Sequence, residues 1–279
     1  MEKITILQAA ESPSKRLSKA FILDADNKIQ TIGYDRCKYF NIKMRDVGSI
    51  DDLSSLLLKI ESRSDLMVIR GLPRSEVDVS KKAFRQTFKP NNPEREVHPP
   101  QEKPFKDEPI SWLMIDVDKQ LLPNGIDLVD DADAAIDCVV KQLPAEFQSV
   151  TYHWQLSSSA GIFNTDHISV HLWFWLTAPQ TSLVIREWAK TFNLITGSKL
   201  IDTALFQAVQ AHYTSAPTLL SAISDPIRQR SGLTKRLSNA VNIDLDIQPP
   251  APTPNTASSS SVKAGRRLLH HSTSTGFDS

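Results

Sequence analysis

Cysteine and glycine are both scarce in this sequence of 279 residues. The two cysteines, Cys37 and Cys138, lie about 100 positions apart, which excludes a disulfide-stabilised scaffold and a zinc site of three or four thiolates from this chain. So few cysteines are typical of a reduced protein, so we expect a cytoplasmic location. The 9 glycines form neither GxGxxG nor GxxxxGK followed by Ser or Thr, which makes the common glycine-rich phosphate loops unlikely candidates for this chain.

Long apolar runs and an excess of one charge are also missing. No apolar run approaches the roughly 20 residues that span a bilayer, and the first ten residues lack the apolar core of a secretion signal, so we expect no membrane partner. The 32 basic residues balance 32 acidic ones, which excludes a uniformly basic coat for nucleic acid but leaves local basic patches open. Hydrophobic residues make up 40% of the chain, which excludes wholesale disorder.

Periodicity predicts both strands and helices, in an order that does not alternate strictly. We therefore expect an α+β fold rather than a doubly wound sheet. The predicted strands cover 4–7, 19–24, 66–70, 111–118, 150–156, 168–176 and 208–216. The predicted helices cover 49–60, 130–143 and 182–194.

The chain divides by composition into one folded part and a tail. Residues 1–248 form the predicted folded part, with an α/β unit over 1–79, a basic proline-rich connection over 80–108 and a second unit over 109–248. Residues 249–279 are rich in Pro and Ser, so we expect a disordered tail or a linker there.

The connection carries seven positive charges between 80 and 106, among them Lys81, Lys82 and Arg85. Its five prolines argue against a continuous helix or a central strand. The segment is therefore either an ordinary solvated loop or a strap that contacts the phosphates of a nucleic acid.

The most specific pattern is a pair of acids at the end of a predicted strand. Asp116 and Asp118 are two positions apart, so both carboxylates point to the same face of the strand. Two like charges in that arrangement repel each other unless a cation lies nearby, and oxygen ligands suit Mg²⁺ or Mn²⁺. The alternative is a strand that ends in a polar turn, where Lys119 neutralises one acid.

Two further patterns could bind a phosphate. Ser157, Ser158 and Ser159 follow a predicted strand, where their hydroxyls and N–H groups could hold a phosphate or a sugar hydroxyl. Ser169 and His171 share the polar face of the next strand, and His171 could donate to a triphosphate. The alternatives are an ordinary Ser/Gly turn and a structural histidine.

The remaining candidates lie later in the chain. Asp202 is either a third carboxylate for a two-metal site or the cap of a following helix. Arg228, Arg230, Lys235 and Arg236 follow one another without an intervening acid. They could contact the phosphates of a template or a nucleotide, or they could form a solvated basic turn.

The order of these motifs resembles the archaeo-eukaryotic primase superfamily. The matching motifs are Met114-Ile-Asp-Val-Asp118, Ser169-Val-His-Leu172 and Leu200-Ile-Asp202. Neighbouring phrases, such as Gln155-Leu-Ser-Ser-Ser-Ala-Gly161, look like the primase-polymerases of plasmids, phages and integrated mobile elements. The resemblance covers about 110–240 and implies an N-terminal α/β unit packed on an antiparallel sheet unit like an RNA-recognition motif.

The resemblance also implies a function: a DNA primase or template-dependent DNA polymerase that joins nucleotides on single-stranded DNA with Mg²⁺ or Mn²⁺. Asp116, Asp118 and Asp202 would be the catalytic metal ligands. The residues implied in nucleotide binding are Ser157, Ser158, Ser159, Ser169, His171, Arg228 and Arg230. The candidates for DNA contact are Lys81, Lys82, Arg85, Lys235 and Arg236. Expected partners are single-stranded DNA, NTP or dNTP substrates and a separate or fused replicative helicase.

Two other functions fit the same residues. One is a non-catalytic initiator, or an origin- or single-strand-binding module, in which Trp173 and Trp175 stack on bases. The other is a metal-dependent nuclease that uses the same three acids. Primer growth that consumes nucleotides would distinguish a polymerase from both.

Overall fold

A computed structural model describes residues 1–85, 104–220 and 222–245 of the chain. Most of the predicted basic connection (86–103) and the predicted tail (249–279) lie outside these residues. The described part contains both helices and antiparallel sheets, which confirms the predicted α+β class. No helix within it is long and apolar enough to cross a membrane.

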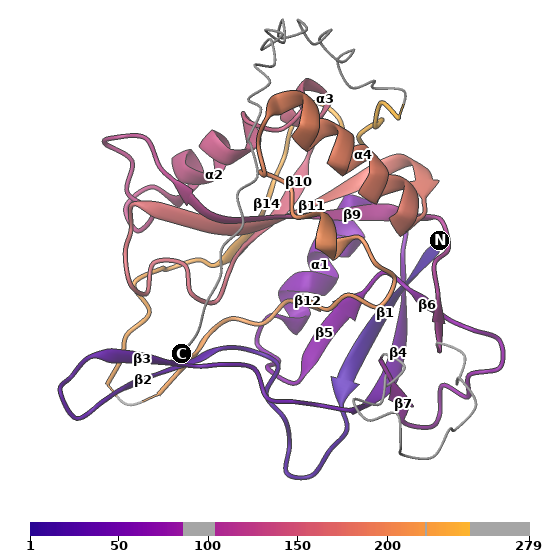
Figure 1. Cartoon of the computed structure of the whole chain (residues 1–279), viewed down its shortest axis with the longest axis horizontal. Helices are drawn as coiled ribbons and strands as arrows, with labels where there is room; N and C mark the ends of the chain where they lie inside the picture. The colour runs from indigo at the N-terminus through magenta and orange to yellow at the C-terminus, as the bar shows by residue number, and fades with distance from the viewer. Residues whose placement is uncertain (86–103, 221, 246–279) are drawn as a thin grey trace, which may run out of the picture. The chain divides into compact units, whose positions relative to one another are not determined.

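A four-stranded antiparallel sheet carries most of the predicted motifs (Figure 1). Its strands, in spatial order, are β14 (Ser231–Thr234), β10 (Tyr152–Leu156), β11 (His167–Gln180) and β9 (Ile110–Leu121). Three helices cover one face of this sheet: α2 (Ala132–Val140), α3 (Ala145–Gln148) and α4 (Ser182–Thr196).

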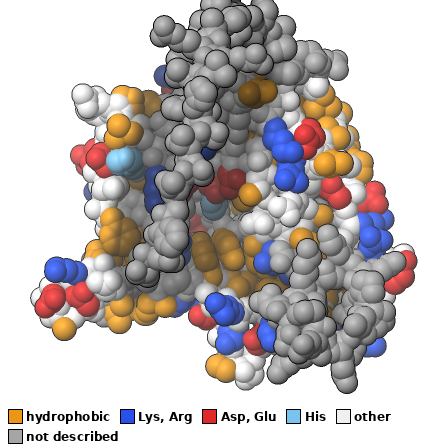
Figure 2. Space-filling model, in the orientation of Figure 1, with side chains coloured by type: hydrophobic (Ala, Val, Ile, Leu, Met, Phe, Trp, Pro, Cys, Tyr) orange, Lys and Arg blue, Asp and Glu red, His pale blue; other side chains and the backbone are white. Residues whose placement is uncertain are grey.

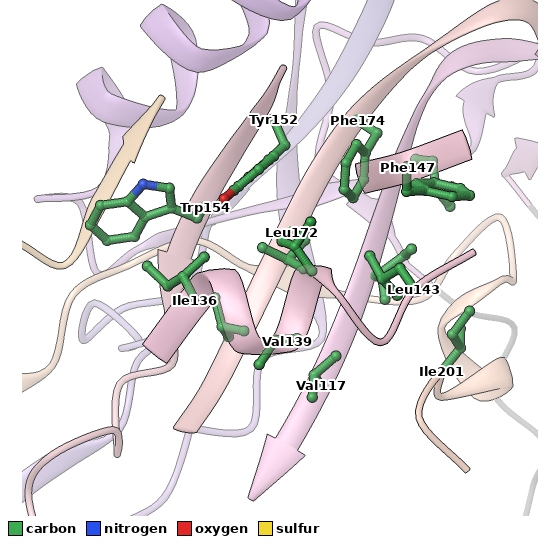
Figure 3. Close-up of a cluster of buried hydrophobic side chains, with 14 of the residues drawn as sticks. Val117, Ile136, Val139, Leu143, Phe147, Tyr152, Trp154, Leu172, Phe174 and Ile201 are labelled. Atoms are coloured by element: carbon green, nitrogen blue, oxygen red, sulfur yellow. The ribbon is translucent and has the colours of Figure 1, made fainter. Parts of the chain in front are cut away.

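The alternation of β9 and β11 explains why the helices pack there. Every second residue, such as Val117, Leu172 and Phe174, points into one apolar cluster with Val139 and Phe147 from the helices (Figure 3). The rings of Phe147 and Phe174 lie 4.9 Å apart at an interplanar angle of 85°, the edge-to-face geometry that aromatic pairs prefer. The opposite residues of both strands are thereby directed to the other face of the sheet.

A second sheet has the order β12–β5–β1–β4–β7. Its strands are β1 (Glu2–Ala9), β4 (Tyr39–Val47), β5 (Leu66–Ile69), β7 (Ala83–Phe84) and β12 (His212–Tyr213). β1 is central and pairs antiparallel with both β4 and β5. β12 comes from much later in the chain and pairs with β5.

Helix α1 (Ile50–Ile60) lies between the two sheets. Ser49 caps its first turn by accepting a hydrogen bond from the Asp52 N–H, so the helix begins one residue after the predicted start. Leu53 and Leu57 are fully buried and pack with Trp112 and Trp173 from the four-stranded sheet. The shared apolar cluster therefore holds the two sheets together below the polar ends of β9 and β11.

Smaller elements complete the described structure. β2 (Ala20–Leu23) pairs with β3 (Ile29–Ile32) and β13 (Thr218–Leu219), and β6 (Leu72–Pro73) pairs with β8 (Phe105–Lys106). A short 3₁₀ helix, η1, covers Thr203–Leu205.

Two sequence predictions need correction. The strand predicted over 208–216 is reduced to β12, because the residues on either side bond singly and irregularly to other segments. The Gly71 N–H donates to the Ala208 carbonyl at 2.6 Å, and the Ala216 N–H donates to the Glu61 carbonyl at 3.0 Å. The helix predicted over 130–143 is shorter at both ends, since Asp131 is its cap and α2 ends at Val140 before a turn.

Candidate functional site

The polar end of the four-stranded sheet forms the candidate site. On β9, Trp112 and Met114 fill the cluster beneath α1, and Asp116 and Asp118 continue the same face beyond it. Pairing places Asp116 opposite His171, His171 opposite Gln155 and Gln155 opposite Ser231. Four strands therefore present one row of polar side chains directly above an apolar core.

Asp116 is the most perturbed acid of this row. Its carboxylate lies 3.6 Å from Nε2 of His171, and the two side chains are 26% and 14% exposed. Burial raises the pKa of Asp116, the nearby imidazole of His171 opposes that shift, and the charges of Asp118 and Asp202 raise the pKa further. Negative charge at this point is therefore incompletely balanced by the surrounding side chains.

Asp118 is oriented by its neighbours on two strands. The Ser169 hydroxyl donates to Oδ1 of Asp118 at 2.8 Å and accepts from the Lys119 N–H at 2.9 Å. Lys119 has a φ of 51°, in the left-handed region, and the β9–β11 register shifts between Ile168 and Val170. The irregular backbone directs Ser169 onto Asp118, so here Ser169 positions an acid.

Asp202 has two roles at once. Its Oδ1 accepts a hydrogen bond from the Ala204 N–H at 2.9 Å, so it caps η1 as the alternative reading of the sequence predicted. It also lines two cavities together with Asp116. The structure thus brings together three acids that come from β9 and from a segment more than 80 residues later.

The large cavity, as we name it here, has a volume of about 610 Å³. It lies where β9, α2 and α4 end. Its lining residues are Asp116, Val117, Asp118, Gln120, Gln142, Thr196, Ser198, Lys199, Leu200 and Asp202.

The small cavity has a volume of about 230 Å³ and lies over the polar row of the sheet. Its lining residues are Ser18, Tyr34, Met114, Asp116, Gln155, Leu156, Ser157, Ser158, His171, Asp202, Leu205, Gln210, Ala211, His212, Tyr213 and Ser215. Figure 2 shows acidic atoms beside a histidine in the recess at the middle of this face. Asp116 and Asp202 line both cavities.

Several buried polar atoms around the small cavity lack partners among the described residues. They are Oε1 of Gln155, Nδ1 of His171 and both ring nitrogens of His212. The Gln155 amide is fixed because its Nε2 donates to the Thr214 carbonyl. Burial lowers the pKa of His212 to about 3, so its ring is neutral and has one donor and one acceptor to offer. Buried polar atoms are normally paired, so this lining suits a polar ligand.

Tyr34 closes one side of the small cavity, and no pattern in the sequence pointed to it. Its ring stacks on that of Tyr213, with centroids 4.0 Å apart and an interplanar angle of 8°. Burial, followed by the proximity of Tyr213, raises the pKa of Tyr34 to about 12, while a hydrogen bond with Ser158 opposes that rise. The negative charges of Asp116 and Asp118 also raise the pKa of Tyr34, so the Tyr34 hydroxyl is close enough to these acids to interact with them electrostatically.

The serine turn is held from below by Arg230, whose side chain is only 5% exposed. Its guanidinium donates to the carbonyls of Ser157 and Ala160 at 3.1 and 3.2 Å and forms an ion pair with Asp225. Ser157 and Ser158 line the small cavity, whereas Ser159 contacts Ser157 at 3.4 Å. Arg230 therefore shapes the wall of the small cavity with contacts internal to the protein.

The other predicted basic residues lie outside both cavities. Lys235 and Arg236 form ion pairs with Asp51 and Asp137, and Arg228 is exposed. In the first part of the predicted connection, Lys81 pairs with Asp78 at 3.4 Å. Lys82 and Arg85 donate to the carbonyls of Ala10 and Val209 at 2.8 and 2.6 Å.

The suggestion that Trp173 stacks on bases is wrong. Trp173 is fully buried and lies 5.4 Å from the ring of Trp112, between the two sheets. Trp175 packs on the same cluster, although part of its surface is exposed. The alternation of β11 was read correctly, but the face opposite the helices is covered by α1 and the second sheet.

The donor atoms of the site suit a hard divalent cation. In the described part of the chain, no three His, Cys, Asp or Glu side chains are close enough to enclose one ion. Carboxylate oxygens are nevertheless the ligands that Mg²⁺ and Mn²⁺ prefer, and the raised pKa of Asp116 marks negative charge that a cation would balance. Asp116, Asp118 and Asp202 supply these oxygens around the large cavity and are the acids that would hold such ions, although the three as they lie here do not enclose a single one.

Comparison with known proteins adds no family to this description. A scan against protein-family models and a search of curated proteins both find no match.

Proposed function

We propose that the protein is a metal-dependent primase-polymerase that copies single-stranded DNA for a mobile genetic element. The observation that carries this proposal is the convergence of Asp116 and Asp202 on the wall shared by two cavities, with Asp118 beside them. A metal-dependent nucleotidyl transfer needs acids between its two substrates, because the cations that these acids would hold stabilise negative charge on both the attacking and the leaving oxygen. Two cavities on either side of the acids provide room for two substrates.

The proposed fold is the primase-type core, with an α/β unit packed on a sheet unit like an RNA-recognition motif. It is supported by the antiparallel order of β14, β10, β11 and β9 with helices on one face. It is also supported by the position of the acids at the end of this sheet that lies beyond the shared core.

The small cavity is the proposed place of the incoming nucleotide. Gln155 and His212 have unpartnered hydrogen-bonding atoms for the sugar or base of the nucleotide. His171 and Ser158 could donate hydrogen bonds to the nucleotide phosphates near Asp116. The cavity is smaller than the roughly 300–1,000 Å³ of sites that enclose a drug-sized ligand, so part of the nucleotide would extend toward the acids.

The reaction joins a 3′-hydroxyl to the α-phosphorus of the nucleotide. A new P–O bond forms as the bond to pyrophosphate breaks, and the hydroxyl proton passes to water. Bound Mg²⁺ or Mn²⁺ would lower the pKa of the attacking hydroxyl and stabilise the negative charge of the leaving group. The chain's own contribution is orientation: Ser169 fixes Asp118, and Arg230 fixes the serine turn.

The basic residues outside the cavities keep their proposed role in DNA binding. Lys81, Lys82, Arg85, Lys235 and Arg236 would contact template phosphates, and Arg228 would contact the nucleotide or the template. Surface ion pairs such as Lys235–Asp51 contribute little stability and can exchange for a phosphate. A separate or fused helicase remains the proposed partner that supplies the single strand.

The test is extension of a labelled primer on single-stranded DNA with Mg²⁺ or Mn²⁺, alongside a reaction without primer. The double variant Asp116→Asn/Asp118→Asn should abolish product, whereas Asp130→Asn/Asp133→Asn, which changes two exposed acids outside the cavities, should not. Products without a primer would establish priming. DNA binding without any synthesis would favour a non-catalytic initiator, and primer shortening would indicate a nuclease.

A further inference from the structure

The large cavity differs from the small one in what faces the acids. Beyond the three carboxylates, its polar lining consists of two amides, two hydroxyls and one cation: Gln120, Gln142, Thr196, Ser198 and Lys199. Within residues 1–85, 104–220 and 222–245, no aromatic ring lines it, and it is formed where β9, α2 and α4 end. Such a lining recognises a flexible polar chain better than a flat base.

Lys199 is the one cation among the described residues that line this cavity. It is exposed, and its side chain forms no ion pair or hydrogen bond with another described residue. It lies two residues after Gly197, the left-handed residue that ends α4 with a φ of 63°. A lysine there also faces the negative end of the helix dipole, so helix stabilisation is the competing role for its charge.

We propose that the large cavity receives the 3′ end of the growing strand and that Lys199 contacts a backbone phosphate of that strand. This inference rests on the proposed function. In a direct displacement at phosphorus, the attacking and leaving oxygens lie roughly in line on opposite sides of the phosphorus. With the nucleotide over the small cavity and the acids between the two cavities, the attacking hydroxyl must arrive from the large cavity.

Binding of the strand end in the large cavity should depend on bound cations, because the acids that line this cavity are negatively charged. Three carboxylates line the large cavity against one lysine, so a polyanionic strand is repelled until cations occupy the acids. Binding of a strand end should therefore require a divalent cation. Ca²⁺ can be used for this measurement, because it supports binding by oxygen ligands while the readout does not depend on turnover.

The experiment compares the full chain with Lys199→Ala and Lys199→Glu. Lys190→Ala is the matched control, since Lys190 lies on α4, the helix that ends before Lys199, pairs with Glu187 and lines neither cavity. Two quantities are measured: the Kd of a fluorescent primer–template with Ca²⁺ across a salt series, and the KM values for primer and nucleotide during single-nucleotide extension with Mg²⁺ or Mn²⁺.

We expect Lys199→Ala to raise the primer–template Kd and the primer KM several-fold, Lys199→Glu to raise both further, and neither to change the nucleotide KM. The slope of log Kd against log salt should fall by about one, as for the loss of one phosphate contact. An unchanged primer KM, or a raised nucleotide KM instead, would overturn the inference while leaving the polymerase proposal intact. Absence of extension by the unmodified chain would overturn the proposed function itself.

Discussion

The two cavities that meet at Asp116 and Asp202 are built in different ways. The small cavity collects side chains from distant parts of the chain, including Tyr34, Gln155 and His212. The large cavity is lined by the ends of regular elements that were visible in the sequence. The difference suggests that one side of the acids is shaped for a single compact ligand, whereas the other side accommodates a chain.

The two cavities also differ in what they cost the fold. Each buried polar atom without a partner costs about 1–3 kcal/mol, and such atoms gather around the small cavity. The amides and hydroxyls of the large cavity lie at chain turns and element ends, where water reaches them more easily. The free-energy cost of unpartnered polar atoms is therefore concentrated around the small cavity, where the nucleotide is proposed to bind.

The largest effect on activity is expected at Asp116, which lines both cavities. Asp116→Asn should reduce nucleotide incorporation by at least about 10³-fold, or about 4 kcal/mol, because it removes a proposed metal ligand. The same change should leave the melting temperature equal or higher, since burial and nearby acids already raise the pKa of Asp116. Primer extension and thermal unfolding measure the two effects, with Asp130→Asn as the control. A variant that is inactive because it unfolds would contradict this account.

The second largest effect is expected at Arg230, which supports the wall of the small cavity but not that of the large cavity. Arg230→Ala leaves Asp225 and two carbonyls without their donor, so the free energy of unfolding should fall by about 3 kcal/mol. Because Arg230 holds the serine turn, the nucleotide KM should rise more than the primer KM. Urea unfolding and steady-state kinetics provide both readouts.

Arg228→Ala is the stability control for that change, since Arg228 is exposed and the expected change is within about 0.5 kcal/mol. Arg230→Lys keeps the charge but loses the planar fork, and it should recover only part of the stability. Equal stabilities for Arg230→Ala and Arg228→Ala would show that the arginine does not hold the turn.

Acid should destabilise the fold through two buried histidines: His212, which lines the small cavity, and His153, which bonds to Ser54 of α1. Burial lowers the pKa values of His212 and His153 to about 3, well below the usual 6.5. Both rings are neutral in the folded and unfolded chain above pH 6.5, so no stability depends on them there. Below it the unfolded chain takes up protons that the folded chain cannot, and stability falls, by about 2 kcal/mol per histidine at about pH 5.

Urea unfolding near pH 7 and near pH 5 tests this expectation. His153→Gln should reduce the difference between the two conditions, whereas His167→Gln should not, because His167 is partly exposed and pairs with Asp166. At lower pH, the raised pKa of Asp116 acts with the opposite sign, since its protonation favours the folded state. A free energy of unfolding that is equal at both pH values would refute the assignment.

The smallest effect is expected from the tyrosine stack. Tyr34→Phe keeps the ring on Tyr213 but removes the hydroxyl that meets Ser158, so stability should fall by about 1 kcal/mol or less. The nucleotide KM should rise modestly and the primer KM should stay unchanged. Tyr39→Phe is the control, because Tyr39 is 41% exposed and lies outside both cavities. A change in the primer KM alone would contradict the assignment of the nucleotide to the small cavity, which Tyr34 lines.

The same contrast explains what could be predicted from the sequence. β11 was predicted from its alternation and β9 from an apolar run that ends in carboxylates. The shared face of Asp116 and Asp118 followed from the two-residue period of a strand. The capping role of Asp202 also followed from its position before Thr203. That Asp202 would meet Asp116 was implied by the family resemblance, because no local pattern encodes a contact between segments so far apart.

Part of the small-cavity lining escaped prediction for a physical reason, although Ser157, Ser158 and His171 were among the candidates. β12 is two residues long, too short to show a period, and it exists because β5 offers an edge to pair with. Tyr34 lies in an irregular segment after β3 that has no motif, and its ring stacks on that of Tyr213. The burial of Trp173 could not be read either, since alternation gives the face of a strand but not what covers that face.

The late strand β12 also has a consequence for how the chain is made. β5 pairs with β12, and β2 pairs with β13. In both pairs the second strand is synthesised long after the first, so β5 and β2 leave the ribosome well before their partner strands do. Pairings over such sequence separations are formed slowly. A nascent chain that ends before β12 has an open edge on β5 and no small cavity. The protein can thus be assembled only once nearly all of its described length has been synthesised.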